Sequence, residues 1–331
     1  MKFLVIQTAF PGDVILASAV MEKLHEFHSA SQIDFLLRKG NESLFASHPF
    51  LNKVIVWDKK KNKLSEILRI LSEVREESYD YVINLHRFAS SGFITAFSGA
   101  KNKIGFDKNP FSFLFTQKFQ HIIGDGTHEV NRNQQLISSI TDSKPSIPKL
   151  YPSEKDFQKV LEYKNTKYNC IAPASVWFTK QWSTHKWVEL INLIPAEQNV
   201  YLLGAPSDYN LCEEIKLSIV NRQSSIVNLA GKLSFLESAA LMKDAIMNYV
   251  NDSAPLHLAS AVNAHVTAVF CSTIPGFGFG PLSDKSFIAQ IKEDLYCRPC
   301  GLHGKSSCPE KHFKCAESIK AKDVFSLSLN N

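Results

Sequence analysis

The chain has 331 residues, of which 44% are hydrophobic and 21% charged, and its net charge is +5. This composition is typical of a folded protein with enough apolar residues for two cores, and it excludes a disordered or low-complexity chain. The positive charge is spread over both halves of the chain, so no basic arm or tail favours a nucleic-acid partner, and we expect none.

The first half alternates short apolar runs with amphipathic segments. The runs "FLVIQ", "QIDFLL", "VIVW", "YVINLH" and "KIGF" predict strands, and "VILASAVMEKLHEF" and "LSEILRILSEVREE" predict helices between them. In the second helix, Ile67, Leu68, Leu71 and Val74 recur at helical spacing and should be apolar contacts. This alternation indicates a parallel sheet covered by helices on both faces.

The segment "TDSKPSIPKLYP", residues 141–152, has three prolines and no periodicity, which predicts a linker. The alternation then restarts, with strands in "NCIAPA", "NVYLLGA", "SIVNLA", "AIMNYVN" and "VTAVF". The helices of this half are "HKWVELINLI", "DYNLCEEIKLSIV", "SFLESAALMKDA" and "PLHLASAVN". We therefore expect an α/β fold with two Rossmann-like, doubly wound domains, residues 1–145 and 152–315, followed by a helical tail at 316–331. Ligands bind at the carboxyl ends of such strands, and two such edges facing each other would form a cleft.

No segment approaches the ~18 consecutive apolar residues of a membrane span. The opening residues "MKFLVIQTAFPGD" have an apolar run of four residues followed by a turn, which does not match a signal peptide. We expect a cytoplasmic protein, soluble or peripheral to a membrane.

Asp13 follows Gly12 where the first strand gives way to the first helix. Two interpretations are open, and both can hold: Asp13 caps the helix through a backbone N–H, and its carboxylate faces the ligand as a catalytic base. The turn lacks the G-x-G-x-x-G of a dinucleotide site, and the chain has no Walker A loop. Dehydrogenase and NTPase functions are therefore disfavoured, and we expect no cofactor.

The loop "APASVWFTKQWS" follows the first strand of the second half and contains Ser175, Thr179 and Lys180. Hydroxyls and an ammonium at the start of a helix suit a pyrophosphate. The alternative is a solvated loop in which the two tryptophans simply pack.

The segment "YVNDSAPLHLASAV" ends a strand and opens a helix of small and apolar residues. Asp252 or Ser253 could cap this helix, or Ser253 and the free N–H groups of the first turn could bind an anion. Pro255 fits the first turn because its missing N–H would lack an intrahelical partner there. His257 lies one turn further and, taken alone, fits a packed histidine better than a ligand-binding one.

Four of the seven cysteines cluster near the carboxyl terminus as C-x2-C-x7-C-x6-C, at Cys297, Cys300, Cys308 and Cys315. The last two cysteines of this cluster do not form the second C-x-x-C of a zinc ribbon. A structural zinc site, free or redox-labile thiols and disulfides therefore all remain open alternatives. In the first half, Arg87 and Arg132 could meet an anionic acceptor, with surface salt bridges as the alternative.

Taken together, these segments resemble the lipopolysaccharide heptosyltransferases of glycosyltransferase family nine. The similarity rests on "GDVILASAV", "NLHR", "HEVNRN", "SVWFTKQW", "GKLSFLESAAL" and "NDSAPLHLASAVN", which together span the chain, and on the cysteine tail. It implies the two-domain GT-B fold and transfer of a heptose from an ADP-linked donor to the lipopolysaccharide inner core. The partners implied are an ADP-heptose-type nucleotide sugar and a lipid-linked oligosaccharide at the inner membrane surface.

The resemblance also implies roles for individual residues. Asp13, after Gly12, corresponds to the proposed general base of the family. Lys180 corresponds to the lysine that contacts donor phosphates, with Thr179 and Ser175 beside it. The donor-binding helix start falls on Asp252, Ser253 and Ala254, with His257 one turn on. Ala254 stands where the family usually has glycine, which leaves the identity of the donor sugar open.

The implied reaction is inverting transfer, in which a base near the acceptor hydroxyl assists its attack. The chain contains no D-x-D motif, so we expect no metal, with Lys180, Thr179 and Ser253 stabilising the departing diphosphate. The alternatives are a sugar-nucleotide epimerase, a two-domain binding protein without catalysis, a non-catalytic nucleotide-sugar-binding relative, and a glycosyltransferase of the same fold that uses another nucleotide sugar or another surface glycan acceptor.

Overall fold

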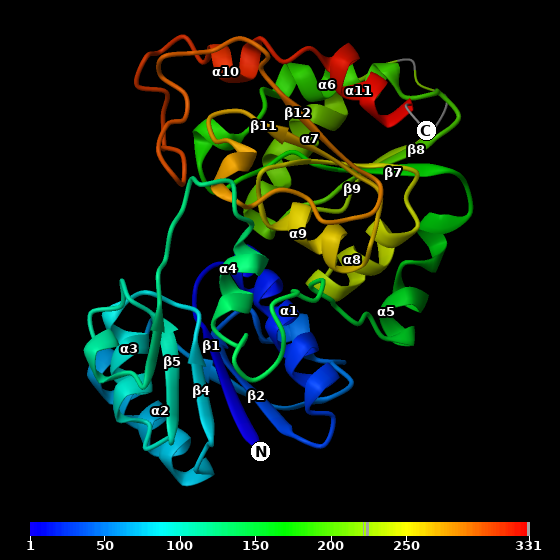
Figure 1. Cartoon of the computed structure of the whole chain (residues 1–331). Helices are drawn as coiled ribbons and strands as arrows, with labels where there is room; N and C mark the ends of the chain where they lie inside the picture. The colour runs from blue at the N-terminus through cyan, green and yellow to red at the C-terminus, as the bar shows by residue number, and fades with distance from the viewer. Residues whose placement is uncertain (221, 223–224, 330–331) are drawn as a thin grey trace. The chain divides into compact units, whose positions relative to one another are not determined.

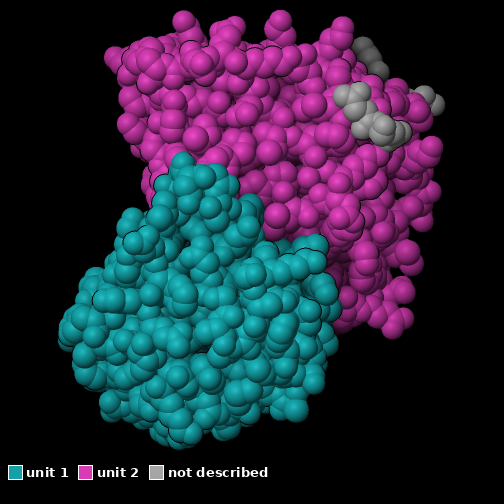
Figure 2. All heavy atoms as spheres, viewed as in Figure 1, with its two compact units in different colours: residues 1–151 teal, residues 152–331 magenta. Residues whose placement is uncertain are grey.

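The computed structural model describes residues 1–220, 222 and 225–329. The chain divides into two compact units, Met1–Tyr151 and Pro152–Asn331, called unit 1 and unit 2 (Figures 1 and 2). The division falls within the proline-containing segment at residues 141–152.

Unit 1 contains a six-stranded parallel sheet in the order β3-β2-β1-β4-β5-β6, with helices against it (Figure 1). The strands are β1 (Lys2–Gln7), β2 (Gln32–Arg38), β3 (Leu51–Trp57), β4 (Tyr81–Asn84), β5 (Asn102–Phe106) and β6 (Gln117–Phe119). The helices are α1 (Pro11–Phe27), α2 (Lys63–Glu77), α3 (Ala89–Phe97) and α4 (Glu129–Gln135), with 3-10 turns η1 (Glu42–Phe45) and η2 (Ser112–Leu114). The strand order reverses between β1 and β4, so their carboxyl ends form a topological switch point, the usual ligand position of such sheets.

Unit 2 repeats this topology with the order β12-β11-β10-β7-β8-β9. Its strands are β7 (Tyr168–Ala172), β8 (Asn199–Leu202), β9 (Ile226–Asn228), β10 (Asn248–Asn251), β11 (Val266–Phe270) and β12 (Ser286–Gln290). The helices are α5 (Glu154–Lys159), α6 (Thr184–Leu193), α7 (Tyr209–Leu217), α8 (Phe235–Lys243), α9 (Ala254–Ala261), α10 (Lys314–Glu317) and α11 (Ala321–Leu329). The 3-10 turns are η3 (Leu161–Lys164), η4 (Phe178–Lys180), η5 (Pro206–Asp208) and η6 (Pro275–Phe277). Here the switch point lies between β7 and β10. The predicted α/β architecture of two doubly wound parallel sheets is confirmed.

Helix α1 begins at Pro11, whose fixed φ and missing N–H suit the first position of a helix. Every residue from Val14 to Leu24 is buried, because the helix lies between the sheet and α4. A helix that is apolar nearly all round is a core helix. The first turn of α1, which contains Asp13, is therefore rigidly attached to the core of unit 1.

Helix α2 corrects one expectation about its apolar face. Ile67, Ile70, Leu71 and Val74 are buried, whereas Leu68 is 60% exposed. The buried four have the spacing i, i+3, i+4 and i+7, which defines one face of an α-helix, and Leu68 lies off that face.

Strands β6 and β12 were not expected from the sequence. Both are the outermost strands of their sheets and are partly exposed. Strand β6 has only three residues, none of them buried, and β12 has one buried residue, Ala289, so neither contains the buried apolar run that identified the other strands, including the edge strands β3 and β9.

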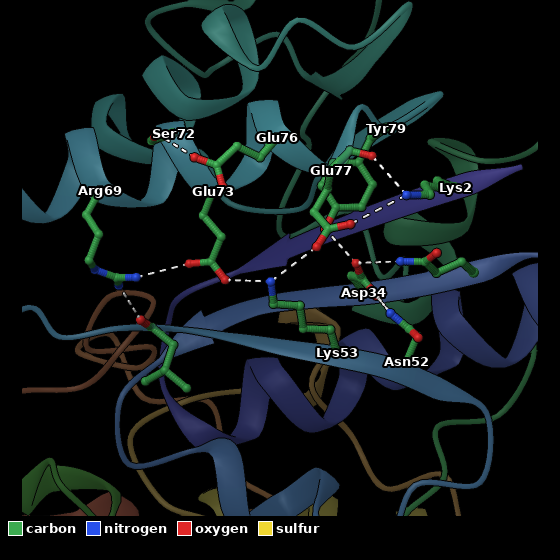
Figure 3. Close-up of polar contacts among 12 residues, drawn as sticks. Lys2, Asp34, Asn52, Lys53, Arg69, Ser72, Glu73, Glu76, Glu77 and Tyr79 are labelled. Atoms are coloured by element: carbon green, nitrogen blue, oxygen red, sulfur yellow. Dashed lines mark hydrogen bonds and ion pairs between the residues drawn. The ribbon is translucent and has the colours of Figure 1, made fainter.

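A polar network closes the amino ends of β1, β2 and β3 (Figure 3). Asp34 is fully buried and accepts hydrogen bonds from the Tyr79 hydroxyl at 2.6 Å and from Asn52 Nδ2 at 2.8 Å. Lys53 on β3 bonds Glu73 and Glu77 of α2 at 2.8 and 3.2 Å, which holds the pKa of Glu77 below its usual range. These groups satisfy one another, so this edge stabilises unit 1, and the opposite, carboxyl edge is left for function.

Over the residues that the structure describes, no helix combines the length and the hydrophobicity that a bilayer crossing requires.

Candidate functional site

The carboxyl edge of unit 1 presents Asp13 in the first turn of α1. Since α1 begins at Pro11, Asp13 is its third residue, and the capping position belongs to Phe10. Asp13 is therefore not the N-cap residue of α1. A half-buried carboxylate in the first turn is stabilised by the positive end of the helix dipole. Gly12 lies beside it in the same turn.

Lys59 braces the β1–α1 connection from the end of β3. Its Nζ donates a 2.6 Å hydrogen bond to the carbonyl of Thr8 and lies 5.3 Å from the centre of the Trp57 ring. Partial burial of the ammonium, together with the nearby Arg38 guanidinium, lowers the pKa of Lys59 to about 8. Arg38 in turn lies over the Phe10 ring at 5.6 Å. Two cations thus adjoin the turn that leads to Asp13.

His86 follows β4 at the same switch point. Its Nδ1 lies 3.2 Å from both Thr8 Oγ1 and Ser91 Oγ. Burial, reinforced by the charges of Lys59 and Arg87, lowers the pKa of His86 to about 3, so the ring is neutral at physiological pH. Both neighbouring cations act on one ring, which makes this edge electropositive.

Of the two arginines that the sequence suggested for an anionic acceptor, Arg87 lies at this edge and Arg132 is 2% exposed. The Arg132 Nε atom bonds Glu129 at 2.8 Å, and its Nη1 bonds the Thr127 carbonyl. Burial raises the pKa of Glu129, an effect that Arg132 opposes. Arg132 therefore forms a buried ion pair with Glu129, not the surface salt bridge that was the alternative.

In unit 2, three adjacent strands, β7, β10 and β11, bring their carboxyl ends together. The Lys180 Nζ atom, in η4 after β7, lies 2.7 Å from Asp252 Oδ2, directly after β10. Thr273, after β11, donates a 2.6 Å hydrogen bond to the same carboxylate oxygen. The Lys180 and Asp252 side chains are 15% and 7% exposed. The sequence segments quoted separately for Lys180 and Asp252 therefore form one site.

Thr179, the buried residue before Lys180, holds the loop through hydrogen bonds. It is 1% exposed, and its Oγ1 accepts hydrogen bonds from Ser272 Oγ at 3.0 Å and from the Lys305 backbone N–H at 2.7 Å. Its own N–H donates to the Lys305 carbonyl at 3.1 Å. The hydroxyl is thus engaged within the protein, and Lys180 is the polar side chain of this pair that reaches the surface.

Asn251, the last residue of β10, fixes the other side of the loop. It is fully buried, accepts the Trp182 backbone N–H at 3.0 Å and donates to the Pro173 carbonyl at 2.6 Å. The loop between β7 and α6 is therefore tied to β10 at both of its ends.

The remaining predicted residues lie around this centre. Ser253 is the residue that precedes α9, and Ala254 is the first residue of that helix. His257 is 5% exposed within α9, as a packed histidine would be. Ser175 is half-buried, and its carbonyl accepts Gln181 Nε2 at 2.7 Å.

Sequence reasoning missed Ser272, Thr273, Gly304 and Lys305. The first two follow the apolar run of β11, and polar residues after a buried strand are a signal that could have found them. Gly304 has φ +80°, and a Cβ built on it would lie 3.0 Å from Lys180 Cγ. Its contact joins residues 124 positions apart, and no local pattern predicts that.

The cysteine-rich segment packs against the same site. The Arg298 Nε and Nη2 atoms donate to the carbonyls of Cys271 and Thr273 at 2.8 and 2.7 Å, and the Cys300 N–H donates to Ser272 O at 2.8 Å. All seven cysteines are free thiols, so the disulfide alternative is wrong. Burial raises the pKa of Cys315 to about 11. In the described part of the chain, no three His, Cys, Asp or Glu side chains are grouped to hold a metal ion.

Comparison with known proteins identifies relatives over the whole length. The profile of Glycosyltransferase family 9 (heptosyltransferase) matches residues 67–311. Lipopolysaccharide heptosyltransferase 1 of Campylobacter coli is 26% identical over 350 residues, which cover 99% of this chain and 98% of the relative. Lipopolysaccharide heptosyltransferase 3 of Escherichia coli K12 is 26% identical over 277 residues, or 80% of each chain.

Solved structures show the same fold. The Escherichia coli ADP-heptose lipopolysaccharide heptosyltransferase II superposes with a TM-score of 0.81 at 21% identity, covering 99% of both chains. The Escherichia coli heptosyltransferase WaaC with ADP-2-deoxy-2-fluoro heptose superposes with a TM-score of 0.71 at 17% identity, covering 88% of this chain and 93% of that one. The fold class expected from the sequence is thereby confirmed.

Proposed function

Because this chain belongs to glycosyltransferase family 9, we propose that it transfers a heptose from an ADP-heptose-type donor to a sugar of the lipopolysaccharide inner core. The curated relatives that span the chain are named as lipopolysaccharide heptosyltransferases, and a structural relative contains a fluorinated ADP-heptose. These names support the donor and the acceptor class.

The observation that carries the proposal is the Lys180–Asp252–Thr273 arrangement beside the first turn of α9. A diphosphate requires a cation and several N–H donors, and a lysine next to a helix N-terminus supplies both. Asp252 and Thr273 hold the ammonium in place. The Lys180 side chain is therefore already ordered before the donor binds, which lowers the entropic cost of binding the donor phosphates.

In the proposed reaction, the acceptor hydroxyl oxygen attacks the anomeric carbon of the heptose and inverts it. The hydroxyl proton passes to the Asp13 carboxylate, which acts as general base. The bond between the anomeric carbon and the β-phosphate oxygen breaks, and its electron pair leaves with ADP. Lys180, Ser253 and the N–H groups of α9 stabilise the negative charge that develops on the diphosphate.

The other site residues act by position. Thr179 holds the Lys180 loop through Ser272 and Lys305. Gly12 and Ser175 lie next to Asp13 and the phosphate loop, respectively. Ala254 and His257, at the start of α9, shape the donor side, where the Ala254 methyl group helps to select the nucleotide sugar.

The electropositive edge around Arg38, Lys59 and Arg87 supports an anionic acceptor. A lipid-linked oligosaccharide at the cytoplasmic face of the inner membrane is such an anionic acceptor. We therefore propose that the protein is a cytoplasmic enzyme, peripheral to that face of the membrane.

Metal independence is part of the proposal, and the absence of a D-x-D motif from the sequence supports it. Transfer should continue in excess EDTA, measured as product formed per minute. Strict loss of transfer, restored by added Mg²⁺ or Mn²⁺, would contradict this part alone.

The direct test incubates the purified chain with ADP-heptose and with lipopolysaccharide from a strain whose core lacks heptose. Mass spectrometry should show one added heptose, and NMR should show inversion at its anomeric carbon. Parallel reactions with UDP- and GDP-sugars test the alternative donors. Donor consumption without acceptor glycosylation would indicate an epimerase or hydrolase. Binding of every nucleotide sugar without any product would indicate a non-catalytic relative.

A further inference from the structure

Exposed aromatic side chains gather on unit 1 between residues 86 and 122. These 37 residues contain eight of the 23 phenylalanines of the chain. Phe88 is 58% exposed, Phe97 39% and Phe113 72%, and Leu114 beside them is 38% exposed. A soluble enzyme rarely exposes so many large apolar side chains in one short segment unless they face a partner.

The exposed rings of Phe97 and Phe113 are connected through the partly buried rings of Phe93 and Phe111. The ring centres of Phe93 and Phe97 lie 4.7 Å apart, those of Phe93 and Phe111 5.8 Å, and those of Phe111 and Phe113 6.4 Å. Helix α3 and the turn η2, which lie in contact, therefore share these rings. We call Phe93, Phe97, Phe111, Phe113 and Leu114 the phenylalanine surface.

Asn109 fixes this surface to the carboxyl edge of the sheet. Its Nδ2 donates to the carbonyls of His86 and Phe88, both at 3.1 Å, and its Oδ1 accepts the Phe111 N–H at 3.0 Å. Asn109 is 2% exposed, and a Cβ on Gly92 would lie 1.9 Å from its Oδ1, so α3 packs tightly against it. The surface is presented by rigid backbone next to the edge that contains His86.

The charge around the surface is strongly biased. Residues 86–122 contain five Lys or Arg residues and one acidic residue, Asp107, a net of +4 in a chain whose total is +5. Lys101 pairs with Asp80 at 3.3 Å. Among the described residues, no carboxylate lies within ion-pair distance of Lys108 or Lys118, and both lysines are exposed. The segment that contains the phenylalanine surface thus carries a net charge of +4.

We propose that the phenylalanine surface and its flanking lysines dock unit 1 on an anionic lipid membrane. Aromatic rings bind at the boundary between headgroups and acyl chains, and lysines beside them are attracted to anionic lipids. A second copy of the chain fits less well, because a two-fold interface would oppose two patches of the same positive charge. The surface adjoins the edge proposed for the acceptor, so docking would bring that edge to a lipid-linked sugar. This last point rests on the proposed function, whereas membrane binding itself does not.

The test measures binding of the full chain to vesicles by flotation, without donor or acceptor. Vesicles of phosphatidylcholine with phosphatidylglycerol should bind the protein, and vesicles of phosphatidylcholine alone should bind it much more weakly. Phe113→Ser should weaken binding to anionic vesicles about tenfold. Leu64→Ser is the matched control, because Leu64 is also 72% exposed but lies on α2, and it should bind like the wild type.

The charge contribution is tested in the same assay. Lys108→Gln and Lys118→Gln should each weaken binding about fivefold, and added salt should reduce the difference. Lys155→Gln and Lys159→Gln, exposed residues of α5 in unit 2, are the charge-matched controls and should have no effect. Circular dichroism confirms that each variant is folded.

Three outcomes would overturn the proposal: equal binding to neutral and anionic vesicles, an equal loss for Phe113→Ser and Leu64→Ser, or a dimer that dissociates in Phe113→Ser when examined by sedimentation. Failure of the proposed function is separate. If no heptose is transferred but Phe113→Ser still weakens binding to anionic vesicles, the proposed docking surface is supported. If both stand, Phe113→Ser should lower transfer to acceptor embedded in vesicles while leaving transfer to detergent-dispersed acceptor unchanged.

Discussion

Replacing Lys180 with methionine tests the donor site most directly. The change keeps the length of the side chain and removes its ammonium, which lies 2.7 Å from Asp252 and, in the proposed function, binds the donor diphosphate. A hydrogen bond to a charged group contributes about 1.5–3 kcal/mol, so ADP should bind about 10- to 150-fold more weakly. The upper end is expected, because the variant leaves the Asp252 carboxylate next to the phosphates without its neutralising partner.

Isothermal titration calorimetry with ADP measures the effect without requiring any acceptor. Lys186→Met is the matched control: Lys186 also has a side chain that is 15% exposed and paired with a carboxylate, Glu189, at 3.1 Å, but it lies on α6. It should bind ADP like the wild type. Removing one partner of the Lys180–Asp252 pair also costs folding stability, so thermal unfolding is followed to confirm that the titrated protein is folded.

A folded Lys180→Met protein that binds ADP within twofold of the wild type would refute the phosphate role. Asp252→Asn in the Lys180→Met background gives a second check. If repulsion from the unpaired carboxylate contributes to the loss, this double variant should bind ADP more tightly than Lys180→Met alone.

Three further outcomes follow from the geometry. Asp13→Asn should lower the transfer rate at least about 100-fold by removing the base, with ADP affinity unchanged by calorimetry; normal turnover would exclude the base role. Gly304→Ala should weaken ADP binding by pressing a methyl group on Lys180, whereas Gly301→Ala, also at positive φ but with open space around it, should not; equal losses would mean that backbone strain alone is responsible. Burial lowers the pKa of His121 to about 4, so this ring is protonated less readily in the folded state than in the unfolded state. Its contribution should therefore lower the free energy of unfolding by about 1 kcal/mol between pH 8 and pH 5.5. Denaturant titrations of His121→Gln should lack that part of the pH dependence, and an unchanged slope would contradict the shift.

The parallel sheets could be predicted from the sequence because buried inner strands require continuous apolar runs. The run "FLVI" before Gln7 is continuous, and β10, although it begins at Asn248, is buried throughout; each strand is followed by a short turn and a helix. The positions of Asp13 and Asp252 at carboxyl ends of strands follow from that order alone. Strands β6 and β12 could not be found in this way, because β6 has three residues, none of them buried, and β12 has a single buried residue, Ala289.

The detailed contacts of the site required the structure. Nothing in the sequence near Thr179 indicates that its hydroxyl is taken up by Ser272 and Lys305, residues 93 and 126 positions away. The same holds for Lys180, whose pairing with Asp252 depends on β7 and β10 being neighbours. Local patterns predict which side chains reach an edge, and the topology decides which of them meet.

The late position of residues 298–328 has a consequence for synthesis on the ribosome. Lys305 bonds Thr179 beside Lys180, and Arg298 bonds the Thr273 carbonyl after β11. Further along the chain, the Ile319 carbonyl accepts a hydrogen bond from Trp182 Nε1, and Ser328 accepts one from the Tyr249 hydroxyl. A nascent chain in which β7 to β11 have already emerged still lacks these hydrogen bonds. Nucleotide capture should therefore arise only after residues 298–328 have emerged, whereas unit 1, whose residues all precede position 152, can fold well before.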